Sequence, residues 1–289
     1  MSIPMNSICF QCHLGRTLDR ARPLGDDAAA TKLTRELMKI YAALPESASS
    51  PYIGPATAKL MQELYGQDPD HMRREKEESN RFVMERFGDI CSRVEQAEDP
   101  LLAALQFSIL GNYLDFAALQ GKVSFSALDE MLDEALEMQL DMDCYRRFRE
   151  DLAKGKSLLY LTDNAGEIAF DRILAEQIEK AYPQLRITFC VRGGPIHNDA
   201  TREDAQVVGL PFPVIDSGNT VGGTEISLLS PEAKAALENA DVVIAKGMGN
   251  VETMYGCGYP VYYAFLVKCE RIVQFFEKPM MTPMLVREK

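Results

Sequence analysis

Three polar clusters in the second half of the chain each follow a short apolar run rich in β-branched and aromatic residues. The clusters occupy positions 163–167, 192–199 and 246–252. Ligands of open parallel sheets bind beyond the carboxyl ends of the strands. We therefore expect the three clusters to lie along one edge of a single sheet and to form one site.

The residue types in two of these clusters favour a hard divalent cation. Asp163, Asn164 and Asp199 offer carboxylate and amide oxygens, which Mg²⁺ and Mn²⁺ prefer as ligands. Asp and Asn also cap helices, so the alternative for the first two is a capping role before a helix near Ala165. The joint pattern predicts a metal site, with Mn²⁺, Mg²⁺, Co²⁺ or Ni²⁺ as the ion.

Glycines in the second and third clusters leave room for backbone N–H groups to approach an anion. Gly193 and Gly194 form one pair, and Gly247 and Gly249 form another. The second pair does not complete a dinucleotide-binding fingerprint, because Glu252 stands where a third glycine would be. The glycines therefore favour phosphate binding over a nicotinamide cofactor.

A cation next to phosphate donors predicts hydrolysis of a phosphate ester. Lys246 would act as a point charge that balances the transition state, and the metal would lower the pKa of a bound water. Attack by Asp163 or Asp199 is the alternative, although a carboxylate that binds a metal is a poorer nucleophile. We predict these three residues to be catalytic.

Two further polar residues interrupt the most apolar segment, 101–119, which we expect to be a central buried helix. Asn112 and Asp115 are spaced i, i+3 and would share one face of that helix. A buried carboxylate costs several kcal/mol unless it is paired. The two side chains either contact substrate or form a polar pair that joins the helical half to the sheet.

Cys9 and Cys12 are spaced to share a zinc ion or a redox disulfide, with Cys269 as a third ligand if the fold brings the termini together. Two reduced cysteines near a helix start are the alternative. The chain has 7 cysteines in irregular positions. An odd number without a framework favours a reducing compartment.

The elements that must position these residues follow from the apolar pattern. Helical periodicity dominates the first half, and later β-prone runs alternate with helical stretches at 157–162, 186–191, 213–216, 241–245 and 261–267. This alternation predicts an α/β fold, a Rossmann-like parallel sheet with helices on both faces. We expect an α-helical region, 1–153, packed on a sheet domain, 154–289, that carries the metal site.

Composition excludes several classes of function. The chain has 289 residues, with 31 basic and 43 acidic side chains and a net charge of −12. Nucleic-acid binding rests on basic clusters, so no nucleic-acid partner is expected. No apolar stretch approaches the ~18 residues of a membrane span, and residues 1–16 lack a secretory signal pattern. We expect a cytoplasmic protein without a membrane partner, and its oligomeric state is not predicted.

Taken in order, the motifs resemble those of the damage-control phosphatase family. They are DNAGE at 163–167, GGPIHNDAT at 193–201 and KGMGNVET at 246–253, while GNYLDF at 111–116 and the Cys-x-x-Cys start are similar to its stand-alone prokaryotic branch. The resemblance implies a helical region on a Rossmann-like domain. It also implies metal-dependent hydrolysis of small phosphorylated metabolites, either sugar phosphates or damaged phospho-metabolites.

The resemblance also assigns roles to single residues. It places metal ligands on Asp163, Asn164 and Asp199, a phosphate contact on Lys246, and substrate contacts on Glu167, Asn198 and Asn250. Two other functions fit the same scaffold. One is an S-adenosylmethionine-dependent methyltransferase, and the other is a non-catalytic metal-binding or redox-sensing protein that uses the paired thiols.

Overall fold

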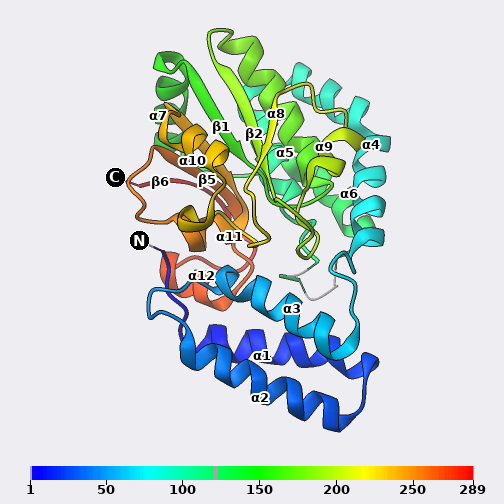
Figure 1. Ribbon diagram of the computed structural model, residues 1–289. Coiled ribbons are helices and arrows are strands. Elements are labelled where there is room, and N and C mark those ends of the chain that lie inside the picture. Colours follow the sequence, from blue (N-terminus) through cyan, green and yellow to red (C-terminus); the bar gives the residue numbers. More distant parts are fainter. Residues whose placement is uncertain (1, 117, 120–122, 289) are drawn as a thin grey trace.

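A six-stranded sheet forms the centre of the molecule. The computed structural model describes residues 2–116, 118–119 and 123–288 (Figure 1). The strand order is β3-β2-β1-β4-β5-β6, with β1 to β5 parallel and β6 antiparallel to β5. The strands are β1 (Ser157–Leu161), β2 (Arg186–Val191), β3 (Val214–Asp216), β4 (Val242–Lys246), β5 (Val261–Leu266) and β6 (Pro283–Arg287). The predicted α/β class is confirmed.

The order of the strands reverses at β1, because β2 lies on one side of it and β4 on the other. In doubly wound sheets, a crevice opens outside the carboxyl ends at this point and binds ligands. Asp163 follows β1 and Gly247 follows β4. The first and third polar clusters therefore flank the reversal point.

Both faces of the sheet are covered, which explains the continuous apolar runs of its strands. In β1, Leu158 and Tyr160 join one core and Leu159 and Leu161 join the other. Helices α4, α5, α7 and α8 pack on the first face, and α10, α11 and α12 pack on the second (Figure 1). The period-2 alternation of side chains thus builds both cores from one strand.

The helices are α1 (Ser7–Ala21), α2 (Asp27–Ala43), α3 (Gly54–Tyr65), α4 (Arg73–Gln96), α5 (Pro100–Gly111), α6 (Phe125–Glu134), α7 (Met142–Lys154), α8 (Glu167–Ala181), α9 (Arg202–Val207), α10 (Pro231–Glu238), α11 (Gly247–Met254) and α12 (Glu270–Phe276). Short 3₁₀ helices lie at Arg22–Leu24, Ser50–Ile53, Ala135–Glu137 and Ile226–Leu228. None of the described helices is both long and apolar enough to span a bilayer.

The helical half of the chain contributes to two different cores. Helices α4 to α7 bury side chains together with the sheet, whereas α1 to α3 enclose a small core of their own around Leu33, Leu37 and Met61. The division of the chain at residue 153 stays a prediction. The main core itself continues across that position, since Leu152 and Leu158 belong to it together.

Helices α1 to α3 lie at the carboxyl edge of the sheet, apart from the helices that cover its faces (Figure 1). The Ile3 N–H donates to Glu252 O in α11 at 2.8 Å, and Ile196, in the loop after β2, lies beside Gly54 at the start of α3. Helix α1 also packs against α12. These helices therefore stand next to the loops that carry the candidate site.

The helix expected over 101–119 is shorter than predicted. Helix α5 ends at Gly111, and the chain turns at Asn112. Position 117 lies outside the described residues. Asn112 and Asp115 consequently do not share a helix face. The prediction was wrong because apolar patterning does not reveal that the Asn112 amide has buried carboxylate partners beyond the end of the helix.

Candidate functional site

Backbone pairing brings the first two polar clusters together. Asn164 and Asp199 form an isolated antiparallel bridge, and the Ala165 N–H donates to Asn198 O at 2.8 Å. The segments after β1 and β2 are thereby held side by side. This pairing places Asp163, Asn164 and Asp199 in one buried cluster, although they are far apart in the sequence.

The predicted metal ligands are buried and sit among their own hydrogen-bond donors. Asp163, Asn164 and Asp199 are 6%, 2% and 6% exposed. The amides of Asn164 and Asn112 donate to Asp163 Oδ2 at 2.7 and 3.0 Å, and Arg192 Nε donates to Asp199 Oδ2 at 2.7 Å. Each carboxylate is therefore held in a fixed orientation by neighbouring side chains.

Electrostatics at the cluster favour a bound cation. Burial, followed by the charges of Glu167 and Asp199, raises the pKa of Asp163 well above its ordinary value. Burial also raises the pKa of Asp199 to about 6. Crowded carboxylates in a low-dielectric interior resist ionisation, and a divalent cation removes that resistance. The two carboxylates and the Asn164 amide oxygen fit a hard cation.

The amide oxygen is a necessary part of this set. Within residues 2–116, 118–119 and 123–288, no group of three or more His, Cys, Asp and Glu side chains is arranged to hold a metal ion. The predicted site counts Asn164 together with the two aspartates, and it stays a prediction.

Asn112 and Asp115 reach the site from the end of α5 by different contacts. The Asn112 amide donates to Glu167 Oε2 at 3.0 Å as well as to Asp163, and Asn112 Oδ1 accepts from the Leu266 N–H at 3.0 Å. Asp115 pairs with Lys268 Nζ at 2.7 Å. The structure thus shows both side chains joining the helical half to the sheet domain, and their contact with substrate stays a prediction.

Lys246 is enclosed by protein groups. Its Nζ lies 3.2 Å from Glu167 Oε1 and 3.1 Å from Asp171 Oδ1, and it donates to the carbonyl and hydroxyl oxygens of Ser108 at 2.6 Å each. The side chain is fully buried. A phosphate contact through Lys246 would require these partners to be exchanged, and that contact stays a prediction.

Asn250 and Asn198 brace the loops of the site. The Asn250 amide donates to Lys246 O at 2.7 Å, and its Oδ1 accepts from the Thr224 hydroxyl at 2.8 Å. The Asn198 amide donates to Asn164 Oδ1 at 3.0 Å, and Asn198 Oδ1 is buried without a hydrogen-bond partner among the described residues. Of the two, Asn198 therefore keeps a free acceptor for a ligand.

Comparison with known proteins identifies the family. The model of the damage-control phosphatase ARMT1-like domain matches residues 5–282. The chain belongs to this family. A damage-control phosphatase of Archaeoglobus fulgidus is 31% identical over 93% of this chain and 94% of its own length.

Further relatives share this similarity over most of the chain. An uncharacterized protein of Methanocaldococcus jannaschii is 29% identical over 94% of this chain and 92% of its own. A crystal structure of a DUF89 family protein from Pyrococcus horikoshii superimposes with a TM-score of 0.83, at 26% identity and 99% coverage of both chains. The family fold thus extends over both the helical half and the sheet.

Two of the glycines act differently from the sequence-based expectation. In this member of the damage-control phosphatase family, the Gly193 N–H donates to Asn219 O at 2.9 Å, and Gly249 packs against the backbone of Gly222. The close approach that these glycines permit is therefore to protein backbone. The Gly193 N–H is already paired, so its expected role as a phosphate donor was wrong, whereas that role stays a prediction for Gly194, Gly247 and Gly249.

Gly247 determines how much space is left for the side chain of Asp163. Its φ is +74°, and a Cβ at this position would overlap the carboxylate of Asp163. Glycine is required here both for the left-handed backbone and for the space that Asp163 occupies. The start of α11 thus fixes one wall of the site.

Sequence reasoning gave no role to three contributors. Arg192 and Lys268 follow β2 and β5, so the rule that ligands bind at carboxyl ends could have found both. Asn80, in α4, accepts from the Gly166 N–H at 2.7 Å and had no sequence signal. It is far from the site in the chain and reaches it only through tertiary packing.

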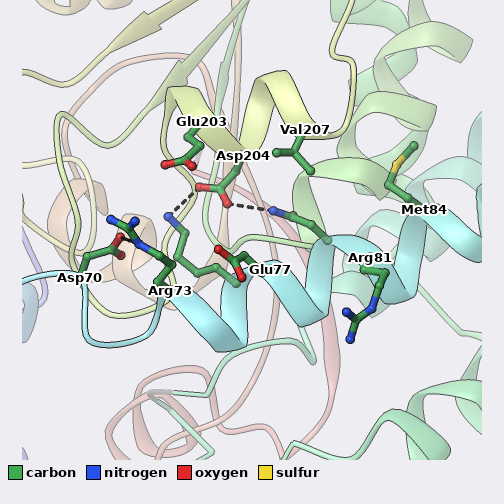
Figure 2. Close-up of a pocket in the computed structure, with 10 residues that line it drawn as sticks. Asp70, Arg73, Glu77, Arg81, Met84, Glu203, Asp204 and Val207 are labelled. Carbon is green, nitrogen blue, oxygen red and sulfur yellow. Dashed lines mark hydrogen bonds and ion pairs between the residues drawn. The ribbon is translucent and has the colours of Figure 1, made fainter.

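Asn80 belongs to a buried network between α4 and α9. The Asn80 amide donates to Asp204 Oδ1 at 2.9 Å, and Lys76 Nζ lies 2.7 Å from Asp204 Oδ2. These residues line a pocket of about 240 Å³, and Figure 2 shows the carboxylate of Asp204 directed toward α4. The network connects Gly166, which follows the predicted ligands Asp163 and Asn164, to helices α4 and α9.

The three cysteines of the predicted second site come from helices that pack together. Cys9 lies in the first turn of α1, and Cys269 caps α12. Burial raises the pKa of Cys269 to about 12, and the charge of Cys9 contributes to that rise. Among the described residues, these thiols and Cys12 are free and are not arranged as a metal group. A zinc or redox role for them stays a prediction.

Proposed function

We propose that this chain is a phosphatase that hydrolyses phosphate monoesters of small metabolites with the aid of a divalent cation. The observation that carries the proposal is the convergence of Asp163, Asn164 and Asp199 at the reversal point of the sheet. Membership in the damage-control phosphatase family supports the reaction class. Sugar phosphates and damaged phospho-metabolites are the substrates we assign.

The side chains around the cluster orient the ligands before any substrate binds. Arg192 holds one oxygen of Asp199, while the amides of Asn112 and Asn164 hold Asp163. Second-sphere contacts of this kind fix ligand geometry and tune affinity for the metal. When bound, a divalent cation polarises a phosphoryl oxygen and lowers the pKa of a coordinated water.

Arg192 supplies a further donor for the substrate. Its Nη2 is buried, has no hydrogen-bond partner among the described residues, and lies 3.7 Å from Asp163 Oδ1. A buried donor that lacks a hydrogen bond, next to the predicted ligands, is suited to bind a phosphoryl oxygen. We assign to it the stabilisation of charge that develops on the phosphate in the transition state.

Two finer features also belong to this proposal. We place the protein in the stand-alone prokaryotic branch of the family with a Cys-x-x-Cys start, and in the cytoplasm. The free thiols of the described cysteines support a reducing compartment. The preferred ion among Mn²⁺, Mg²⁺, Co²⁺ and Ni²⁺ is to be decided by assay.

The test combines turnover with direct metal binding. The purified protein should hydrolyse p-nitrophenyl phosphate or a sugar phosphate with Mn²⁺ and lose this activity with EDTA. Asp163→Asn should abolish both turnover and Mn²⁺ binding measured by calorimetry. Asp216→Asn is the matched control, since Asp216 ends β3 at the same edge but pairs with Arg202 at 2.8 Å. Activity that survives EDTA and Asp163→Asn would falsify the proposal.

A further inference from the structure

Lys268 is a buried lysine at the carboxyl edge of the sheet. It follows strand β5, and the residue is 2% exposed. Its Nζ lies 2.7 Å from Asp115 Oδ2 and donates to the backbone carbonyl of Asn112. Burial of an ammonium is costly unless the group is paired and hydrogen-bonded. The two contacts therefore show where the charge of Lys268 is used.

The contact with Asn112 lies at the end of helix α5. Backbone carbonyls in the last turn of a helix have no partner within the helix, and Asn112 is the C-terminal cap of α5. Lys268 supplies a donor to the carbonyl of Asn112, and a positive charge is favoured at this end of a helix. Lys268 thus holds the backbone at the point where the chain leaves α5.

The side chain of Asn112 is held in one orientation. Asn112 is 0% exposed, and its Oδ1 accepts from the Leu266 N–H at 3.0 Å, beyond the last β4–β5 pair at Ala264. Because a backbone N–H can only donate, the amide nitrogen of Asn112 must face the other way. It donates to Asp163 Oδ2 and to Glu167 Oε2 at 3.0 Å each. The end of β5 therefore directs this amide toward the metal cluster.

We propose that Lys268 is a positioning residue for the predicted metal ligand Asp163 and that it acts through Asn112. Lys268 holds the backbone of Asn112, and the amide of Asn112 holds one oxygen of Asp163. Groups that contact the ligands of a metal fix their orientation and so set the affinity of the site. This inference rests on the proposed function for the identity of Asp163 as a ligand.

A positioning role and a purely electrostatic role predict opposite results. The positive charge of Lys268 by itself repels a cation, so removal of that charge alone should strengthen metal binding. Loss of the contact with Asn112 releases the amide that orients Asp163, so the positioning role predicts weaker binding. The direction of the change in affinity therefore distinguishes the two roles.

A charge-neutral double variant isolates the contact with Asn112. Lys268→Met alone would leave Asp115 without its cation and destabilise the fold. Lys268→Met combined with Asp115→Asn removes both charges of the pair, and the new amide keeps an oxygen for the Ala118 N–H, which donates to Asp115 at 2.7 Å. We expect this double variant to bind Mn²⁺ roughly 10- to 100-fold more weakly in calorimetry, at a temperature where both proteins are folded. Equal or tighter binding would overturn the inference.

A third substitution tests whether the effect passes through Asn112. Asn112→Ala should itself weaken Mn²⁺ binding. Introducing the two substitutions at Lys268 and Asp115 into that variant should then cost less than about a further twofold in affinity, because residues that act through one another are not additive. Fully additive losses would overturn the route through Asn112.

The matched control removes an ion pair near the other end of β5. Arg287 pairs with Asp151 at 3.1 Å and lies opposite Tyr262 in the sheet. Asp151→Asn combined with Arg287→Met should bind Mn²⁺ as tightly as the wild type. A loss as large as that of the Lys268 variant would show that any lost pair on β5 weakens the site, and the assignment to Lys268 would be overturned.

Failure of the proposed function is recognised separately. If the wild type binds none of the four divalent ions, the proposed function fails, and crystal structures of the metal-free wild type and double variant still decide the inference. In the double variant, the Asn112 amide should lie beyond hydrogen-bond distance of Asp163 Oδ2. An amide that keeps this hydrogen bond would overturn the positioning role.

Discussion

Replacing Lys246 by Met tests whether its charge is structural. Its Nζ lies 3.2 Å from Glu167 Oε1 and 3.1 Å from Asp171 Oδ1, and all three side chains are fully buried. Met keeps the length of the side chain but leaves two carboxylates without their cation. Breaking a buried ion pair costs about 3–5 kcal/mol. For a protein of this size, the melting temperature should fall by roughly 6–20 °C.

The loss should depend on pH in a defined direction. Burial raises the pKa of Asp171 to about 6, while Lys246 opposes that rise. The Asp171 carboxyl therefore binds its proton more tightly in the folded state than in the unfolded state. The contribution of this carboxyl to the stability of the fold falls as the pH rises through its folded pKa. Without the cation the pKa rises further, so the difference between variant and wild type should be largest at pH 8 and smaller at pH 5.

Urea unfolding followed by circular dichroism at both pH values measures the effect. Lys246→Met combined with Asp171→Asn should recover part of the lost free energy of unfolding, because one of the stranded charges is then absent. A loss below about 1 kcal/mol in Lys246→Met, or a difference that grows toward acid, would refute the structural role. Full stability with lost turnover would instead favour the phosphate contact predicted from the sequence.

Three further results are expected. Asn80→Ala removes the acceptor of the Gly166 N–H and should weaken Mn²⁺ binding by roughly 10- to 100-fold in calorimetry, with a smaller change if the network only supports packing. Gly247→Ala forces a Cβ against Asp163 and should abolish phosphatase turnover and Mn²⁺ binding, while the far-UV circular dichroism spectrum stays unchanged. Normal affinity of this variant for Mn²⁺ would contradict the close approach of Gly247 to Asp163. Burial lowers the pKa of His13 to about 4, so the unfolded state takes up the proton at a higher pH than the folded state. The free energy of unfolding should therefore fall by up to about 3 kcal/mol between pH 6.5 and pH 4, and His13→Gln should reduce this dependence on pH in urea unfolding.

The strands of the sheet were predictable because they are buried on both faces. The five predicted strands begin and end within one residue of β1 to β5. Their apolar runs stand out from the helices between them. Strand β6 was missed, since Pro283–Arg287 is a short edge strand that begins with proline and pairs on one side only. An edge strand of that kind is difficult to recognise from its local sequence.

The candidate site was predictable in its residue types but not in its contacts. The rule for carboxyl ends of strands identified Asp163, Asn164 and Asp199, and the structure places them together. The same rule could not distinguish Lys246, whose ammonium is fully hydrogen-bonded by protein groups, from Arg192, whose Nη2 has no hydrogen-bond partner among the described residues. That difference depends on which side chains of α5 and α8 lie next to Lys246 in the folded protein. The sequence around Lys246 and Arg192 does not indicate these neighbours.

The sequence by itself determined the α/β class, the edge of the sheet at which ligands are expected and the oxygen donors that stand there. Periodicity and residue chemistry are local properties, so they can be recognised in the sequence without knowledge of the fold. Only the tertiary structure decided which charges are paired and which are left for a ligand. Helices α5 and α8 enclose Lys246 through packing between distant segments, so Ser108, Glu167 and Asp171 take up its charge.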